Sequence, residues 1–398
     1  MKLGLLIPRY GEEALGGIEN WLRSLCERLV AERGWEVDVY TTCASSAETW
    51  ADDYPPGSTE LNGVRVHRYR ATSGRDPRYL HMIPRLRADP ASVGEEWADR
   101  YLRLVGPVCP EAVAAAAGAP CHAVAVAPYL YWPAVEGVPA LGPRVVFHPA
   151  AHDEPELHLP PMRRVFAAAG GFAYNTFAER ELVESTFPVG HLPSEVVGIA
   201  VKGERGDPLH ARRSLGLDPG ERYVLCVGKV ERAKGCAVLA DMWRIYRQRR
   251  PDAPRLVFVG PVHDRIDAPD GVLLAGRQPE EVKWGALAGC EAVVSPSAQE
   301  SFSLVVLEAW LAGRPVVVNS RCGPTVEHCL RSGGGLIFDG YGELEVAVDV
   351  LLGDAALART LAERGRSYAE TVFAWPTVLD RYERLVAAVA RMAGAGRR

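Results

Sequence analysis

Short apolar runs alternate along the chain with longer stretches in which apolar residues recur three or four positions apart. A short run without polar alternation predicts a strand buried on both faces, and the spaced pattern predicts an amphipathic helix. Strands and helices that alternate in this way are typical of parallel sheets covered by helices, so the pattern predicts an α/β fold. The predicted strands are residues 2–7, 37–42, 64–69, 123–127, 144–147, 172–174, 195–201, 223–227, 256–259, 272–274, 292–295, 316–318 and 336–338.

The alternation is interrupted once, in a segment rich in Pro and Gly at residues 188–208. It then starts again, and a chain of 398 residues is too long for one ordinary core but fits two domains. The pair Trp375-Pro376 ends the second series, and the apolar stripe that follows must pack on another element. We expect a first domain at 1–190, a second at 191–375, and a final helix at 376–398 that returns to the first domain.

Composition and charge exclude several classes of protein. With 48% hydrophobic and 24% charged residues, the chain is typical of a globular protein. The net charge of −5 argues against a dedicated nucleic-acid binder, which is normally basic. No apolar window reaches the length of about 18 residues that a membrane span needs, and no signal peptide precedes the first strand. We therefore expect a cytoplasmic protein with at most peripheral membrane contact. Its nine cysteines form no Cys-x-x-Cys pair, which suggests neither disulfides nor a zinc site.

The segment at residues 295–315 carries two acidic side chains, one before and one inside a predicted helix. Glu300 and Glu308 are eight residues apart, a little over two helical turns, so both carboxylates can face one crevice. The free amides at a helix entrance bind anions favourably. Here these amides are expected to be those of Ser301, Phe302 and Ser303. Carboxylates that accept hydrogen bonds from hydroxyl groups, next to an anion site, suit a sugar nucleotide. The alternative is that both acids are ordinary helix charges.

A pair of lysines follows the predicted strand at 223–227. Only five of the 45 Lys and Arg residues are lysines, and two of these, Lys229 and Lys234, lie in one loop. Both precede a predicted helix N-terminus, where a diphosphate binds favourably, and their clustering indicates a site that prefers a compact ammonium. Solvated surface lysines are the alternative.

Two polar or flexible segments follow strands in the first half of the chain. Gly16 and Gly17 form a strand-to-helix turn that lets the backbone approach a ligand closely, although a packing turn is the alternative. His148 and His152 follow the strand at 144–147, at the edge of the sheet where open α/β proteins bind ligands. Loop-lining histidines are the alternative there, and a metal is not expected because the HExxH spacing is absent.

Residues 72–90 lack periodicity and mix basic with apolar side chains. A solvated loop is one interpretation, and a loop that faces the acceptor or a membrane surface is the other.

The spacing of Glu300 and Glu308, the GKVERAKG loop, the GGIEN turn and the HDEP sequence together resemble the motifs of retaining glycosyltransferases of family 4. This family has the GT-B architecture of two facing Rossmann-like domains. The resemblance covers nearly the whole chain, since the four motifs occur in the family's order at the expected ends of strands. Two positions depart from the family: Lys229 stands where Arg is usual, and Ser301 where Gly is frequent.

The resemblance implies a role for each candidate residue. Glu300 would bind hydroxyls of the transferred sugar, and Glu308 would accept hydrogen bonds from the ribose. Gly17 would let the backbone of its turn approach the phosphates. The diphosphate would be neutralised by Lys229 and Lys234, assisted by amides near Phe302 and Ser303. The histidine near the reacting carbon best matches His152, with His148 as second choice.

The implied reaction is transfer of a hexose-type sugar from a nucleoside-diphosphate sugar to a hydroxyl group, with retention of configuration. No metal or other cofactor is expected, because cations and amides would stabilise the departing diphosphate. The acceptor classes left open are a polysaccharide, a lipid-linked sugar and a small metabolite. Alternative functions are a sugar-nucleotide epimerase, a sugar phosphorylase, and a non-catalytic nucleotide-sugar-binding partner. The sequence specifies neither the base of the donor nor the oligomeric state.

Overall fold

The chain divides into two compact units, and each is described by itself. The computed structural model describes residues 1–13 and 16–395. Unit 1 comprises Met1–Gly198 and Val378–Arg398, and unit 2 comprises Ile199–Thr377. These divisions fall a few residues beyond the boundaries that the sequence suggests at 190 and 375.

Unit 1 is built on an eight-stranded sheet in the order β3-β4-β2-β1-β5-β6-β7-β8. All neighbours are parallel except β3 and β4. The central strands are buried apolar runs, as the sequence pattern predicts. The strands are β1 (Lys2–Leu6), β2 (Glu36–Thr42), β3 (Gly57–Leu61), β4 (Val64–Tyr69), β5 (Ala123–Val126), β6 (Val145–Phe147), β7 (Gly171–Tyr174) and β8 (Ser194–Val196).

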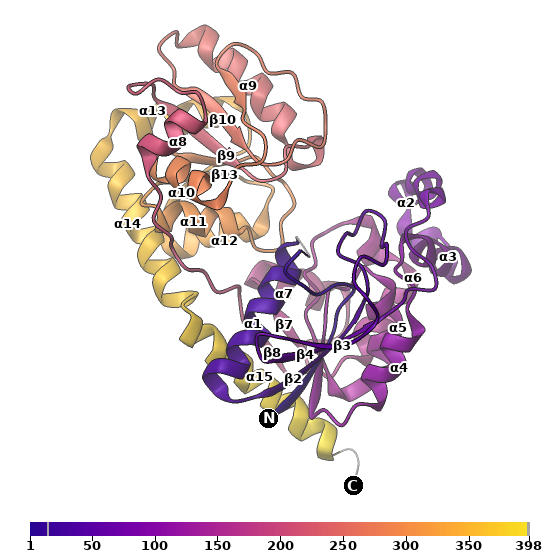
Figure 1. Cartoon of the computed structure of the whole chain (residues 1–398). Coiled ribbons are helices and arrows are strands. Elements are labelled where there is room, and N and C mark those ends of the chain that lie inside the picture. Colours follow the sequence, from indigo (N-terminus) through magenta and orange to yellow (C-terminus); the bar gives the residue numbers. More distant parts are fainter. Residues whose placement is uncertain (14–15, 396–398) are drawn as a thin grey trace. The chain divides into compact units, whose positions relative to one another are not determined.

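Helices accompany the strands of this sheet (Figure 1). The predicted final helix is α15 (Trp375–Ala395), which buries Val378, Leu379 and Tyr382 completely within unit 1. This confirms the predicted return of the chain to the first domain; residues 396–398 of that prediction lie outside the described residues. The remaining helices are α1 (Gly17–Arg33), η1 (Pro77–Met82), α2 (Ile83–Ala88), η2 (Pro90–Ser92), α3 (Glu95–Val105), α4 (Pro110–Gly118), α5 (Trp132–Leu141), η3 (Gly142–Arg144), η4 (Pro155–His158), α6 (Pro160–Ala168) and α7 (Phe177–Thr186).

The interpretation of residues 72–90 as a loop is wrong for most of that segment. It contains η1 and α2, and Leu86 on α2 is fully buried. Both helices have only six residues, too few for a helical repeat of apolar positions to stand out in the sequence.

Unit 2 is built on a six-stranded parallel sheet in the order β11-β10-β9-β12-β13-β14. Chain order runs outward from β9 to β11 on one side and from β12 to β14 on the other, so the direction of winding changes between β9 and β12. Ligands bind at such a switch point, beyond the carboxyl ends of the strands. The strands are β9 (Tyr223–Val227), β10 (Arg255–Val259), β11 (Val272–Leu274), β12 (Val293–Ser295), β13 (Val316–Asn319) and β14 (Gly335–Phe338). The helices are α8 (Pro208–Ser214), η5 (Arg232–Lys234), α9 (Cys236–Arg249), α10 (Glu280–Gly289), α11 (Leu304–Leu311), α12 (Gly323–Ser332), α13 (Tyr341–Gly353) and α14 (Ala355–Val372).

These two parallel-sheet units confirm the predicted fold class. None of the helices in the described part of the chain combines the length and hydrophobicity that crossing a bilayer requires.

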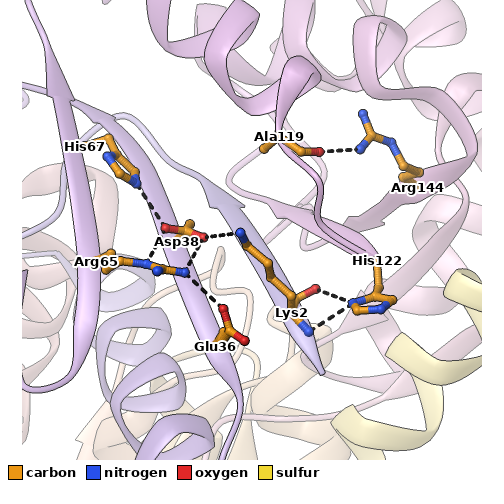
Figure 2. A network of polar contacts seen from close by, with 8 residues as sticks. All are labelled: Lys2, Glu36, Asp38, Arg65, His67, Ala119, His122 and Arg144. Carbon is orange, nitrogen blue, oxygen red and sulfur yellow. Dashed lines mark hydrogen bonds and ion pairs between the residues drawn. The ribbon is translucent and has the colours of Figure 1, made fainter.

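A polar network ties the first strands of unit 1 together (Figure 2). Asp38 on β2 is only 4% exposed, and its carboxylate accepts hydrogen bonds from three basic side chains on the neighbouring strands. Lys2 Nζ lies 3.3 Å from its Oδ2, while Arg65 Nε and His67 Nε2 lie 2.9 and 3.0 Å from its Oδ1. Burial opposes the charge, but the hydrogen bonds from His67, Arg65 and Lys2 outweigh it and lower the pKa of Asp38.

We expect Asp38→Asn to reduce the free energy of unfolding by about 2 kcal/mol at neutral pH, because hydrogen bonds to a charged group are lost. The lowered pKa means that this contribution is present above the unfolded-state pKa of about 4 and is lost as the pH falls through the lower folded-state value. Urea unfolding of both proteins at pH 7 and pH 3 measures it. A difference between the two proteins that does not shrink at pH 3 would contradict the assignment.

Candidate active site

Two loops meet at the switch point of the unit 2 sheet. One follows β9 and contains the clustered lysines, and the other follows β12 and leads into α11. Gly235, in the left-handed conformation with φ 75°, makes their close approach possible, because a Cβ atom there would lie 2.7 Å from Pro296 O. A side chain at this position would therefore push the two loops apart.

The loops are joined by an ion pair between two predicted site residues. Lys234 Nζ lies 2.8 Å from Glu300 Oε1 and donates a second hydrogen bond of 3.3 Å to Gln299 O. The side chains of Lys234 and Glu300 are 33% and 23% exposed, so both stay accessible to a ligand. The sequence placed these residues in one site, and the structure brings them into contact.

Lys229 lies at the start of the same loop and is exposed. Within the described part of the chain its ammonium has no hydrogen-bond or ion-pair partner. The backbone beside it is tightly packed, since a Cβ atom on Gly260 would collide with Gly228 O. Lys229 is thus a free cation on a fixed backbone.

The helix entrance differs from the expectation. Helix α11 begins at Leu304, and Ser303 precedes it in a left-handed conformation with φ 70° and ψ 77°. The amides of Ser301, Phe302 and Ser303 were expected at the entrance, but all three residues precede the helix. The amides left without an intrahelical partner are those of Leu304 and Val305. The anion site stays a prediction, since Ser303 is the N-cap residue and its amide lies at the entrance beside those of Leu304 and Val305.

Phe302 has a packing role that the sequence did not show. It is 2% exposed, and its carbonyl accepts a hydrogen bond of 3.0 Å from His328 Nε2. Burial lowers the pKa of His328 to about 4, so the ring is neutral at physiological pH and donates from Nε2. Its ring also packs edge-on against Phe302. These contacts fix the backbone just before α11.

Glu308 is paired with a lysine that the sequence did not single out as a site residue. Lys283 on α10 places its Nζ 3.0 Å from Glu308 Oε1. Burial raises the pKa of Glu308 even though Lys283 favours its charged form. The two acids of the segment therefore have different partners, Lys234 for Glu300 and Lys283 for Glu308. Only the rarity of lysine in the chain pointed to Lys283.

In unit 1 the two candidate histidines have different environments. His148 is 2% exposed, and its Nε2 lies 3.2 Å from the hydroxyl of Tyr382 on α15. Burial lowers the pKa of His148 to about 3. His152 is partly exposed, and its Nδ1 lies 3.3 Å from Glu154 Oε2. Of the two, only His152 is accessible to a ligand.

The loop that carries His152 is anchored by the buried side chain of Glu179 on α7. Its Oε1 accepts from the Ala151 amide at 2.8 Å, and its Oε2 accepts from the Asn175 amide at 2.6 Å. Glu179 thus connects the segments after β6 and β7, a role that the sequence did not reveal.

Gly17 is the first residue of α1 and is exposed, with open space where a side chain would project. The crowded position is Gly16, where a Cβ atom would collide with the Glu19 carboxylate. Glu19 also holds Arg9 through a contact of 2.7 Å from Arg9 Nε to Glu19 Oε1. The turn is thus fixed by its own side chains and leaves Gly17 open.

Across residues 1–13 and 16–395, no group of three or more His, Cys, Asp or Glu side chains is arranged to hold a metal.

Comparison with known proteins identifies the segment that carries the unit 2 site. The family model "Glycosyl transferases group 1" matches residues 221–354. The D-inositol 3-phosphate glycosyltransferase of Pseudarthrobacter chlorophenolicus is 34% identical over 175 residues, 40% of each chain. That of Mycobacterium sp. (strain JLS) is 30% identical over 246 residues, 55% of this chain and 54% of the relative. The chain thus spans about half the length of the curated relatives that it matches.

Solved structures match over nearly the whole chain. Sucrose-phosphate synthase from Thermosynechococcus elongatus has a TM-score of 0.71 at 20% identity, covering 99% of this chain and 100% of that one. HepE from Anabaena has a TM-score of 0.69 at 17% identity, and the match covers 97% of this chain and 99% of HepE. The chain therefore has the fold of these proteins, the GT-B fold of two parallel-sheet α/β units. The segment that the family model matches contains five residues of the unit 2 site: Lys229, Lys234, Lys283, Glu300 and Glu308.

Proposed function

We propose that the protein is a retaining glycosyltransferase that moves a hexose-type sugar from a nucleoside-diphosphate sugar to an acceptor hydroxyl. The observation that carries the proposal is the grouping of Lys229, the Lys234–Glu300 pair and the entrance of α11 at the switch point of the unit 2 sheet. Cations and free amides beside a carboxylate provide what a diphosphate joined to a sugar requires.

The chemistry needs stabilisation of the negative charge that develops on the departing diphosphate. Lys229 and Lys234 would supply positive charge, and the amides of Leu304 and Val305 would supply hydrogen bonds. Glu300 would accept from hydroxyls of the transferred sugar, and Lys234 would hold its carboxylate in place. No metal is part of the proposal, and retention of configuration rests on the resemblance to family 4.

In unit 1, His152 would lie near the reacting carbon, and Gly17 would let the turn before α1 approach the phosphates. Both positions follow strands at the carboxyl edge of the sheet, where α/β proteins bind ligands. The exposure of His152 and of Gly17 supports these roles.

For the acceptor, a phosphorylated polyol is the class we favour. The relatives with matching sequence are named after D-inositol 3-phosphate. In unit 1, the Arg75 guanidinium lies 5.5 Å from the Trp50 ring and 5.6 Å from the Tyr79 ring, and its Nε has no hydrogen-bond partner. No carboxylate of the described residues pairs with Arg75. A guanidinium without an acidic partner is suited to a phosphate.

The test is a panel of uridine, guanosine and deoxythymidine diphosphate sugars, beginning with UDP-glucose because HepE was solved in complex with it. Thermal stability and slow donor hydrolysis are measured without acceptor. One donor is expected to stabilise the fold by about 2.7 kcal/mol at a hundredfold excess over its dissociation constant. Adding inositol 3-phosphate is then expected to accelerate donor consumption more than inositol does.

Other outcomes would favour the alternative functions. Conversion of the donor into another nucleotide sugar would indicate an epimerase, and a requirement for free phosphate would indicate a phosphorylase. Binding without turnover with any acceptor would indicate a non-catalytic partner. Absence of binding by every donor would overturn the proposal.

A further inference from the structure

The loop that follows β6 contains a strained residue two positions before His152. Ala150 has φ 53°, a left-handed conformation that residues with a Cβ atom rarely adopt. Such a conformation persists only where the surrounding structure holds it, and it occurs most often at functional sites. The loop therefore needs contacts that keep Ala150 in this shape.

The carboxylate of Glu179 on α7 supplies these contacts. Its Oε1 accepts a hydrogen bond of 2.8 Å from the amide of Ala151, the peptide that follows Ala150. The amide of Ala150 itself, which belongs to the preceding peptide, hydrogen-bonds to the same carboxyl group. The two peptides that define the conformation of Ala150 are thus held by one side chain.

Glu179 has this position against the cost of its burial. It is 1% exposed, and burial raises its pKa to about 8, although the amides that donate to it favour the charged form. Capping of α7 does not require a buried carboxylate there, because the hydroxyl of Thr176 already accepts from the Glu179 amide at 3.0 Å. The contacts with the loop account for a costly group that the helix does not need.

The other end of the loop is anchored by Tyr129. Its hydroxyl donates to Glu154 Oε1, and its amide donates a hydrogen bond of 3.1 Å to Pro149 O. His152 lies between these two anchored positions, and Glu179 holds the strained one.

We propose that Glu179 is a positioning residue for sugar transfer: it holds the peptides on both sides of Ala150 and thereby places His152 for its role in the reaction. The inference rests on the proposed function, which puts His152 beside the reacting carbon. It adds a buried residue of another helix that acts on turnover through His152.

Amide hydrogen exchange of the full chain without ligand measures the state of the loop directly. In Glu179→Gln an amide group replaces one of the two acceptor oxygens. The amides of Ala151 and Asn175 are therefore expected to exchange about tenfold faster than in the wild type, the value of one hydrogen bond. Glu181→Gln removes an exposed carboxylate from the same helix and should leave both rates unchanged.

Kinetics separate positioning from a purely structural role. The rate of transfer is measured with UDP-glucose and inositol 3-phosphate, or with the pair that replaces them in the panel. Glu179→Gln is expected to lower this rate about a hundredfold, the cost of misplacing a group by about 1 Å, and to leave the dissociation constant of the donor unchanged. Added to His152→Ala, it is expected to change the rate little, because a residue that acts only through another is not additive with it.

Glycine at position 150 provides a rescue. Ala150→Gly removes the strain, because glycine adopts the left-handed conformation readily, so it is expected to restore about tenfold of the rate lost in Glu179→Gln. Ala119→Gly is the matched control, at an alanine of unit 1 with an ordinary φ of −70°, and should restore nothing. Ala150→Val tests the loop without changing the buried carboxyl group, and it should lower the rate because β-branched residues avoid positive φ.

Four outcomes would overturn the inference alone: unchanged exchange of the Ala151 amide in Glu179→Gln, an equal loss of rate with and without His152, no rescue by Ala150→Gly, or a full rate in Ala150→Val. Failure of the wild type to transfer sugar from any donor would instead overturn the proposed function, and the inference with it.

Discussion

Lys234→Met and Glu300→Gln are each expected to lower the rate of sugar transfer by about a hundredfold to a thousandfold, the usual effect of removing one preorganised charge from a transition state. Lys234 would stabilise the departing diphosphate, and Glu300 would orient the sugar. Because the two side chains are 2.8 Å apart and join the loops after β9 and β12, each substitution also leaves the other residue without its partner. Steady-state kinetics with the donor found in the panel measure the effect.

The contact between these side chains also predicts how the substitutions combine. The double variant is expected to lose little more activity than either single variant, because residues that act as a unit are not additive. Lys202→Met is the control, since Lys202 is an exposed lysine of the same unit outside the site. If the fold-losses of the two single variants multiply in the double variant, the two residues do not act together. Unchanged rates in both single variants would show that neither residue belongs to the site.

His152→Ala is expected to reduce turnover by at least about a hundredfold while leaving donor affinity unchanged, because the proposed role of His152 is beside the reacting carbon. Its partial exposure and its 3.3 Å approach to Glu154 Oε2 fit a group that acts on a bound ligand. Comparing the donor dissociation constant with the rate constant of transfer checks this. A loss of donor affinity without loss of turnover would contradict the role.

His148→Asn serves as the contrasting substitution, and its expected effect is on stability. The pKa of His148 is lowered to about 3 by burial, so in the folded protein the ring stays neutral where the unfolded chain takes up a proton. Stability is therefore lost as the pH falls from about 6.5 toward the folded value. The wild type should lose more stability than the variant between pH 7 and pH 4.5. His328 contributes in the same range but is unchanged in both proteins.

Most of the strands that the sequence predicted are apolar runs whose pattern burial determines, and β4 was predicted from its buried valines although its polar residues alternate with them. Strand β3 was missed because it is exposed and polar, with the sequence GSTEL. The turn Asn62-Gly63, with both residues at positive φ, connects it to β4 and was the available signal. Helix α5 was missed for the opposite reason: it is buried nearly all round, so it shows no polar face.

The candidate site was predictable where its residues belong to one loop or one helix entrance. The Lys234–Glu300 contact and the Lys283–Glu308 pair depend on how loops and helices pack across the sheet, and no local spacing encodes that. The helix entrance was misplaced because Ser303 adopts a left-handed conformation that apolar periodicity does not reveal.

The position of α15 bears on the order in which the two units can be completed during synthesis. Unit 2 is a continuous segment, Ile199–Thr377, whereas unit 1 needs residues from Val378 onward. Tyr382, which closes over His148, is therefore synthesised after the whole of unit 2. A nascent chain ending before this helix would expose the apolar surface that Val378, Leu379 and Tyr382 cover, so the half that carries His152 is expected to mature last.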